Sequence, residues 1–330
     1  MNKLIVILGP TASGKTGLSI RLALRLRSGQ AKKFGTRGAE IVSADSRQVY
    51  KGMDIGSGKI TKKEMTGVHH HLLDVANPKR RFTVAQYQKL ALKAIEKIHK
   101  KNKIPILVGG TGFYIQSVVD SIVIPEVKPD WKLRKKLEKM SNEKLYKMLL
   151  AKDPKRAKNI DRQNPRRLIR ALEIIIITGN PVSPLKFSAQ GRPASGWDIL
   201  QIGVAKSPEE LKNLIHKRLI KRLAPLNYGR SHASRSEDLT GIKNGAMINE
   251  VKKLRKSLSW KRLEEFGLEY RFVAQYLQNK TTYQEMTDNI QKESEHYSKR
   301  QMTWFKRDKR IRWIQNQQEA EKLVNDFLKK

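Results

Sequence analysis

The chain has 330 residues, enough for a full α/β core and a second, smaller domain, and its 68 Lys and Arg against 31 Asp and Glu give a formal net charge of +37. A surplus of this size attracts polyanions, so nucleic acid is the leading partner, although general solubility or a basic host proteome would produce the same composition. Cysteine is absent, which excludes disulfides and thiolate metal sites.

The N-terminal segment predicts a buried strand, a glycine-rich turn and a helix. A short apolar run spans Lys3 to Leu8, Gly9 closes it, and helical periodicity begins at Lys15. The run is too short for the core of a signal peptide or for a membrane span. We therefore expect a cytoplasmic protein with no membrane segment.

The turn itself matches the phosphate-loop pattern G-x-x-x-x-G-K-[ST], in its expected place between a strand and a helix. Backbone N–H groups and the helix dipole of such a loop hold a polyphosphate, Lys15 neutralises it, and the Thr16 hydroxyl meets Mg²⁺. We therefore predict a polyphosphate site with Mg²⁺ as its cofactor. The loop residues expected to bind are Gly9, Pro10, Thr11, Ala12, Ser13, Gly14, Lys15 and Thr16.

Further strands and helices alternate along the chain. The pattern predicts strands at 40–44, 104–108 and 199–204, and helices at 84–100 and 211–223. This alternation favours an α/β fold, a phosphate-loop core with a parallel sheet flanked by helices. Residues 126–196 are basic and mostly helical, which predicts an inserted helical domain within a core formed by 1–125 and 197–330.

The acidic residues near the predicted strand ends indicate which type of reaction the site can catalyse. Many phosphoryl-transfer enzymes place an acid after a second strand to organise Mg²⁺. Strand 104–108 ends instead in Gly109-Gly110-Thr111-Gly112, which disfavours the alternative of a small-molecule kinase. Asp45 follows strand 40–44 and so lies at the carboxyl edge of the sheet, where ligands bind. Position alone leaves open whether Asp45 is a helix N-cap or a catalytic group.

Six blocks of the sequence can be compared with known families. They are residues 9–16, 43–56, 70–75, 108–114, 166–173 and 299–305, and the match extends over residues 4 to 305. In their order along the chain these blocks resemble the tRNA dimethylallyltransferases, also called tRNA isopentenyltransferases. Six ordered blocks are far more specific than a phosphate loop alone.

The resemblance implies transfer of a dimethylallyl group from dimethylallyl pyrophosphate to the N6 amine of the adenosine 3′-adjacent to a tRNA anticodon. Pyrophosphate leaves in this displacement at carbon, which explains why no γ-phosphate machinery is present. Asp45 is then the general base, while Thr16 and Arg222 act on the leaving group and Arg218 helps to bind the donor. The tRNA contacts implied, besides Asp45, are Ser46, Arg47, Gln48, Thr111, Arg134, Arg166, Arg167, Leu168, Ile169 and Arg170.

A target base stacked in the anticodon loop must be flipped out, which requires a grip on the RNA backbone. We expect the inserted domain to hold the anticodon stem-loop and the protein to act as a monomer. A second basic group near the C-terminus combines charge with aromatic rings, a composition suited to phosphate contact and stacking. Taken singly, a charge of this kind is more often part of a solvated surface than an RNA contact. This group contains Lys299, Arg300, Trp304, Phe305, Lys306 and Arg307.

Three features depart from the family pattern. Segments 28–39 and 228–244 are longer than usual, and Glu269 stands where the family commonly has Gly before Tyr, which leaves the tRNA contacts of that region open. The run His69-His70-His71 is not predicted to bind a metal, because adjacent residues point in different directions and no further His or Cys stands at ligand spacing. The apolar run 174–177 is predicted to be core.

Overall fold

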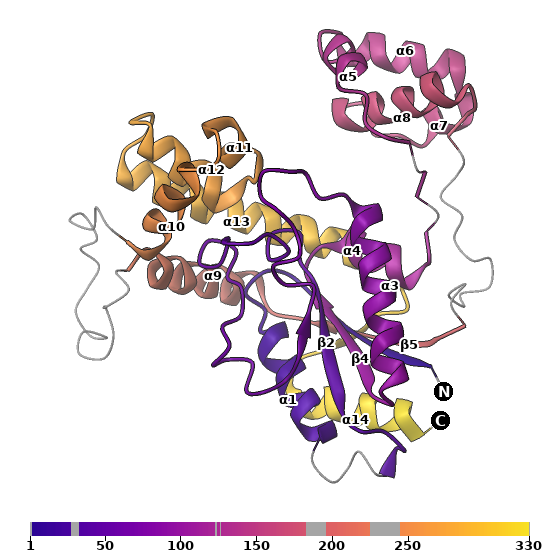
Figure 1. Cartoon of the computed structure of the whole chain (residues 1–330), viewed down its shortest axis with the longest axis vertical. Helices are drawn as coiled ribbons and strands as arrows, with labels where there is room; N and C mark the ends of the chain where they lie inside the picture. Colours follow the sequence, from indigo (N-terminus) through magenta and orange to yellow (C-terminus); the bar gives the residue numbers. More distant parts are fainter. Residues whose placement is uncertain are drawn as a thin grey trace. The chain divides into compact units, whose positions relative to one another are not determined.

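The computed structural model forms two compact units, Met1–Val119 with Pro193–Lys330 and Asp120–Arg192 (Figure 1). The second unit lies within the sequence of the first and is therefore an insertion. The sequence predicts the boundaries of this inserted domain at residues 126 and 196. The structure describes residues 2–27, 33–122, 124–125, 127–182, 196–224 and 245–329.

The first unit is built on a parallel sheet, as the sequence predicts. Its strand order is β3-β2-β4-β1-β5-β6, and every pair of neighbours is parallel. In the centre, Val6 of β1 lies opposite Leu107 of β4 and Gln201 of β5. The two short edge strands, β3 and β6, were not predicted. The strands are β1 (Lys3–Leu8), β2 (Ala39–Ala44), β3 (His70–His71), β4 (Ile104–Gly109), β5 (Asp198–Val204) and β6 (Arg312–Ile314).

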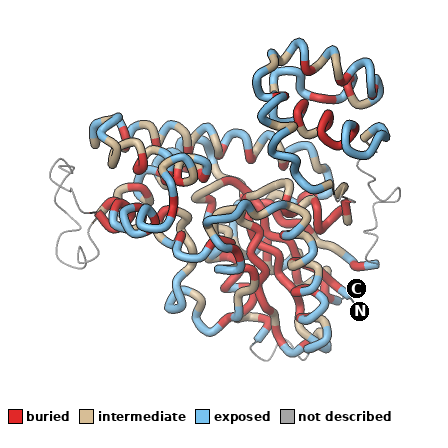
Figure 2. The backbone as a smooth tube through the Cα atoms, turned by 45° about the horizontal axis from the view of Figure 1, so that its top comes forward, coloured by how far each residue is buried: buried red, intermediate tan, exposed pale blue. Residues whose placement is uncertain are grey.

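Helices cover both faces of this sheet, so its strands are buried (Figure 2). Leu4, Val6 and Leu8 of β1 belong to the apolar cluster with α3 and α4, and Ile5 and Ile7 to the cluster with α1 and α14. Side chains alternate between the faces of a strand, which is why an uninterrupted apolar run suits this position. The helices of this unit are α1 (Lys15–Arg27), α3 (Val84–Lys100), α4 (Gly112–Val119), α9 (Pro208–Leu223), α10 (Ala246–Arg255), α11 (Trp260–Glu265), α12 (Leu268–Leu277), α13 (Tyr283–Phe305) and α14 (Gln317–Lys329).

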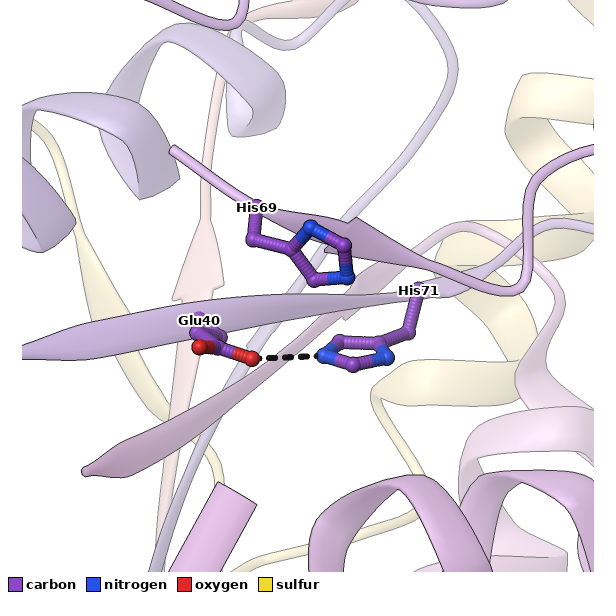
Figure 3. Close-up of side chains that lie close together, drawn as sticks. All are labelled: Glu40, His69 and His71. Atoms are coloured by element: carbon purple, nitrogen blue, oxygen red, sulfur yellow. Dashed lines mark hydrogen bonds and ion pairs between the residues drawn. The ribbon is translucent and has the colours of Figure 1, made fainter. Parts of the chain in front are cut away.

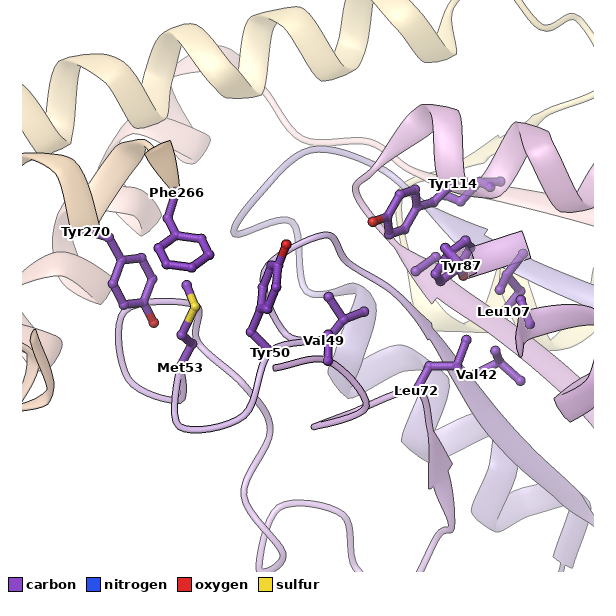
Figure 4. Packing of buried hydrophobic residues seen from close by; sticks show 14 of the residues in the cluster. Val42, Val49, Tyr50, Met53, Leu72, Tyr87, Leu107, Tyr114, Phe266 and Tyr270 are labelled. Atoms are coloured by element: carbon purple, nitrogen blue, oxygen red, sulfur yellow. The ribbon is translucent and has the colours of Figure 1, made fainter. Parts of the chain in front are cut away.

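Helix α3 begins and ends at the predicted residues and fixes the end of β2. Thr83 starts it with a capping box, accepting a hydrogen bond from the N–H of Gln86. Tyr87 then stacks on Tyr114 of α4 at 3.9 Å between ring centroids and donates a hydrogen bond to the carbonyl of Ser43 at 3.1 Å (Figure 4). The strand end that precedes Asp45 is thereby held from one face of the sheet.

The segment after β2 packs against the C-terminal helices. Tyr50 meets Phe266 edge to face at 5.1 Å between ring centroids, and Phe266 meets Tyr270 of α12 at 5.9 Å (Figure 4). Met53 in the same cluster is fully buried. Aromatic pairs in this geometry add to the apolar burial, so the middle of segment 45–58 is anchored to the C-terminal helices.

The second unit is a small helical domain with its own apolar core. Leu145, Leu149, Leu168 and Leu172 are fully buried there. Its helices are α5 (Trp131–Leu137), α6 (Asn142–Lys152), α7 (Pro154–Lys158) and α8 (Pro165–Thr178).

The prediction that all of 174–177 is core was wrong. Ile174 and Ile175 are buried, whereas Ile176 and Ile177 are 42% and 47% exposed, because a helix presents only one face to its core. None of the helices in the described ranges is long and apolar enough to cross a membrane.

Candidate active site

The phosphate loop connects the carboxyl end of β1 to the start of α1. Gly9 has φ 148°, and a Cβ there would lie 2.9 Å from the carbonyl oxygen of Val204 in β5, so the close approach of the strand requires glycine. Ala12 adopts a left-handed φ of 63°, a strained conformation of the kind found at functional sites. The Lys15 ammonium donates hydrogen bonds to the Pro10 carbonyl and to Ser13 Oγ, within the loop itself.

Helix α9 places two neighbouring arginines at this site, of which Arg218 contacts the phosphate loop itself. Arg218 Nη1 donates to Thr11 Oγ1 at 3.3 Å, and Arg222 Nη1 donates to the Gly56 carbonyl at 3.1 Å. A Cβ on Gly58 would lie 1.9 Å from Nη2 of both arginines, so those two atoms are no more than twice that distance apart. With a side chain at position 58, both guanidinium groups would have to shift. Among the described residues, the buried Nη2 of Arg222 has no hydrogen-bond partner.

The electrostatics of this cation cluster, defined as Lys15, Arg218 and Arg222, are those of a site that favours an anion. Burial and then the Arg218 guanidinium lower the pKa of Lys15 to about 7, while Asp45 acts in the opposite direction. Burial and then Arg222 lower the pKa of Arg218 to about 10, with Glu269 and Asp45 opposing. Like charges crowded out of water are stabilised by a polyanion bound among them.

The loop that carries Gly56 and Gly58 is held by two residues that the sequence did not single out. The Glu250 carboxylate of α10 accepts hydrogen bonds from the N–H groups of residues 54, 55 and 56 at 2.7, 2.6 and 3.0 Å. Tyr270 of α12 donates to Glu250 at 2.8 Å and accepts from the N–H of Ser57 at 3.1 Å. Burial and then the Glu250 charge raise the pKa of the Tyr270 hydroxyl.

Asp45 stands at the carboxyl end of β2 and organises the turn that follows. Its Oδ1 accepts hydrogen bonds from the N–H groups of Arg47 at 2.8 Å and Gln48 at 3.2 Å. Residues 46–49 form turns, so Asp45 caps a turn and not a helix. The hydrogen bonds within the described ranges involve only Oδ1, which leaves Oδ2 as a hydrogen-bond acceptor for a ligand.

The neighbours of Asp45 are also tied to the framework. The N–H of Ser46 donates to Thr111 Oγ1 at 3.0 Å, at the end of β4. The Gln48 amide donates to the Gly58 carbonyl at 3.2 Å, and its oxygen lies 3.5 Å from Ser43 Oγ. Gln48 therefore links the turn after β2 to the glycine beside the arginines.

Helix α13 connects the phosphate loop to the end of β4 through Gln301. This residue lies in the sixth matching block, and the sequence alone does not predict a role for it. The Gln301 side chain is 6% exposed. It accepts from the N–H of Thr11 at 2.8 Å and donates to the carbonyl of Gly110 at 2.7 Å. Tyr297 lies one turn earlier on α13, and burial followed by the Asp45 charge raises the pKa of its hydroxyl.

The site has a suitable oxygen ligand for Mg²⁺. Thr16 lies in the first turn of α1 with an exposed side chain, and no group in the described ranges is hydrogen-bonded to its hydroxyl. A hydroxyl at this position, with phosphate oxygens and water, provides the all-oxygen coordination that Mg²⁺ prefers.

In the second unit, two of the arginines predicted to contact tRNA form a buried ion network. Arg134 and Arg170 both pair with Glu173, whose side chain is fully buried. Burial alone would raise the pKa of Glu173, but hydrogen bonds from the two guanidinium groups and the Asp130 N–H hold it below its usual range. These arginines therefore stabilise the helical unit.

The other residues of block 166–173 that were predicted to contact tRNA lie on two different faces of α8. Arg166 and Arg167 are exposed in the first turn of α8. Leu168 and Ile169 are 0% and 6% exposed in the apolar core, which leaves only their backbone for a contact with RNA.

The basic group near the C-terminus is exposed at Lys299, Arg300, Lys306 and Arg307. Trp304 packs edge to face on Phe113 at 6.3 Å between ring centroids. The expectation that Phe305 offers a stacking surface was wrong, because this ring is 3% exposed and belongs to the core.

The histidine run lies near Glu40, which stands on the neighbouring strand β2. Ligand atoms of Glu40, His69 and His71 all lie within 4.8 Å of one another beside β2 and β3 (Figure 3). The Glu40 carboxylate already accepts hydrogen bonds from His71 at 2.8 Å and from Lys101 and Lys103. The two lysine ammonium groups on the Glu40 carboxylate would repel a divalent cation. We therefore interpret these residues as an ion network that provides the buried carboxylate with hydrogen-bond partners.

Of the departures from the family pattern, the first part of segment 28–39, residues 28–32, and the whole of segment 228–244 lie outside the described residues. Glu269 is described: its carboxylate pairs with Arg222 at 2.7 Å.

Comparisons with known proteins cover nearly the whole chain. The IPP transferase family model matches residues 48–225 and 240–308. A tRNA dimethylallyltransferase from Finegoldia magna is 38% identical over 318 residues, which cover 94% of this chain and 90% of that protein. One from Acetivibrio thermocellus is 36% identical over 319 residues, which cover 95% and 92%.

Solved structures give the same result. The full-length tRNA isopentenylpyrophosphate transferase from Bacillus halodurans aligns with a TM-score of 0.67 at 32% identity, over 100% of this chain and 97% of that one. A eukaryotic dimethylallyltransferase acting on tRNA aligns with a TM-score of 0.65 at 25% identity, over 92% and 70%. From the family model and these relatives together, the chain belongs to the IPP transferase family, that of the tRNA dimethylallyltransferases.

Proposed function

We propose that this protein transfers a dimethylallyl group from dimethylallyl pyrophosphate to the N6 amine of the adenosine on the 3′ side of a tRNA anticodon. The main support is that Lys15 and Arg218 lie together at the phosphate loop, with Arg222 next to Arg218, and that the Asp45 carboxylate acts on the charges of Lys15 and Arg218. Cations suit a leaving group on which negative charge grows, and a carboxylate suits an amine that loses a proton. The names of the relatives support the same reaction.

In this reaction the N6 nitrogen forms a bond to the allylic carbon while the carbon–oxygen bond to pyrophosphate breaks. The bonding electron pair leaves with the pyrophosphate, where the cation cluster stabilises it. The N6 proton becomes acidic as the new bond forms, and Asp45 accepts it on Oδ2 while its Oδ1 stays fixed by the N–H groups of Arg47 and Gln48. Mg²⁺ at Thr16 would supply further positive charge for the leaving pyrophosphate.

The missing acid after β4 supports a displacement at carbon over phosphoryl transfer. Residues 109–112 consist of three glycines and Thr111, so no carboxylate stands there to organise a metal for a γ-phosphate. Thr111 instead accepts a hydrogen bond from the N–H of Ser46, the residue next to the proposed base Asp45.

The proposal is tested by mass spectrometry of an anticodon stem-loop RNA after incubation with the protein, dimethylallyl pyrophosphate and Mg²⁺. We expect one dimethylallyl group on the adenosine 3′ to the anticodon. A stem-loop with guanosine at that position is the control and should stay unmodified. Unmodified adenosine RNA, together with phosphate transfer from ATP to a small acceptor, would instead identify a kinase.

The arginines of α8 should separate into RNA contacts and structural residues. Arg166→Ala should reduce the slope of log affinity for tRNA against log salt by about 0.7–0.9 and leave the Tm unchanged, because an exposed arginine contributes one phosphate contact. Arg170→Ala should lower stability by roughly 1–3 kcal/mol, because it removes a partner of the buried Glu173. Salt titrations of binding and thermal melts measure the two effects, and an unchanged salt slope for Arg166→Ala would assign this residue to the solvated surface.

A further inference from the structure

A carboxylate enters the cation cluster from the C-terminal helices. Glu269 lies in the first turn of α12, and its Oε1 accepts a hydrogen bond from Arg222 Nη1 at 2.7 Å. The two side chains are 15% and 11% exposed, so the pair is largely withdrawn from solvent. Such a pair is screened much less by salt than a surface ion pair.

The hydrogen bonds of Arg222 show how this carboxylate affects a bound anion. Nη1 is shared between Glu269 and the Gly56 carbonyl, whereas the buried Nη2 points to the space beside Gly58 and has no partner in the described ranges. Glu269 thus fixes the orientation of Arg222 in the free protein. A diphosphate that used Nη2 would share one guanidinium with this carboxylate, and the two anions would repel each other.

Glu269 also acts beyond its direct partner. Its charge favours protonation of Arg218, against the effects of burial and of Arg222. Glu269 therefore adds a negative charge, besides those of Asp45 and Glu64, that partly balances the three cations. This charge stabilises the cations and lowers their attraction for a diphosphate.

We propose that Glu269 is a positioning residue that holds Arg222 in the free protein and weakens diphosphate binding, which favours the release of pyrophosphate after transfer. The inference rests on the proposed function. Because the diphosphate is common to the donor and the product, Glu269 sets the affinity for both.

The test is the binding of inorganic pyrophosphate to the full-length protein, measured by calorimetry at a fixed Mg²⁺ concentration. Glu269→Gln keeps a side-chain oxygen that can accept from Arg222 but removes the charge. We expect pyrophosphate to bind about tenfold more tightly, with a lower KM for the donor and no gain in kcat. A residue that only maintained the structure would give weaker binding when replaced.

The matched control is Glu210→Gln, which removes the same charge at the start of α9, where Glu210 pairs with Lys206 at the surface. Its affinity for pyrophosphate should stay within about twofold of the original. Unchanged or weaker binding by Glu269→Gln, with a normal thermal melt, overturns the inference. Prenylation of RNA is scored separately, so tighter pyrophosphate binding without any prenylation would support the role of Glu269 and reject the proposed function.

Discussion

Replacing Asp45 with Asn is expected to slow single-turnover prenyl transfer by about 10²–10⁴-fold. Asn keeps an oxygen at the Oδ1 position, which accepts hydrogen bonds at 2.8 and 3.2 Å from the N–H groups of Arg47 and Gln48. The turn should therefore survive, and only the group that accepts the N6 proton is lost. Rapid-quench assays with saturating donor and RNA measure the rate.

Folding and tRNA affinity of Asp45→Asn should stay close to those of the unchanged protein. Asp288→Asn is a matched control, since Asp288 is exposed on α13 and accepts a hydrogen bond from Gln284, four residues earlier on the same helix. It should transfer the prenyl group at a normal rate. A near-normal rate for Asp45→Asn itself would limit Asp45 to its role in the turn and place the base elsewhere.

Replacing Lys15 with Met should weaken pyrophosphate binding roughly 10²-fold, because a charge-assisted contact inside a buried cation cluster is lost. Met has a similar length and no charge. Calorimetric titration measures the affinity, and Lys206→Met, at a surface ion pair, is the control that should bind normally. Equal affinities for all three proteins would contradict a direct role for the Lys15 ammonium.

The same variant tests the pH dependence of binding. The pKa of Lys15 is about 7 in the free protein, below its ordinary value. Pyrophosphate favours the charged form of Lys15 and so raises this pKa. Above about pH 7, binding of pyrophosphate is therefore accompanied by uptake of a proton. The affinity for pyrophosphate then falls as the pH rises, by up to about tenfold per pH unit. Calorimetry in buffers of different ionisation enthalpy measures the number of protons taken up on binding. This number should be smaller for Lys15→Met, because the protons that Lys15 takes up are lost.

The elements that the sequence predicted well carry strong local patterns. The run of β1, the phosphate loop and α3 with its capping box each depend on residues that are neighbours in the chain. Edge strands β3 and β6 have only two and three residues, too short for a periodic pattern, and they exist because a longer strand pairs with them.

The supporting residues of the site could not be predicted for a related reason. Glu250, Tyr270 and Gln301 act on segments far away in sequence, and no local pattern encodes such contacts. One available signal was overlooked: Glu173 stands within the apolar run of α8, and a buried acid needs cationic partners. That position indicates a structural role for Arg134 and Arg170.

The central place of β1 has a consequence for synthesis of the chain on the ribosome. One edge of β1 pairs with β5, and Asp198, the partner of Lys3, is synthesised 195 residues later. At ordinary elongation rates that edge stays unpaired for about 10–40 s, open to association with other chains. Codons that slow translation of the inserted unit extend this interval, so the yield of folded protein depends on how quickly the ribosome passes through a segment outside the sheet.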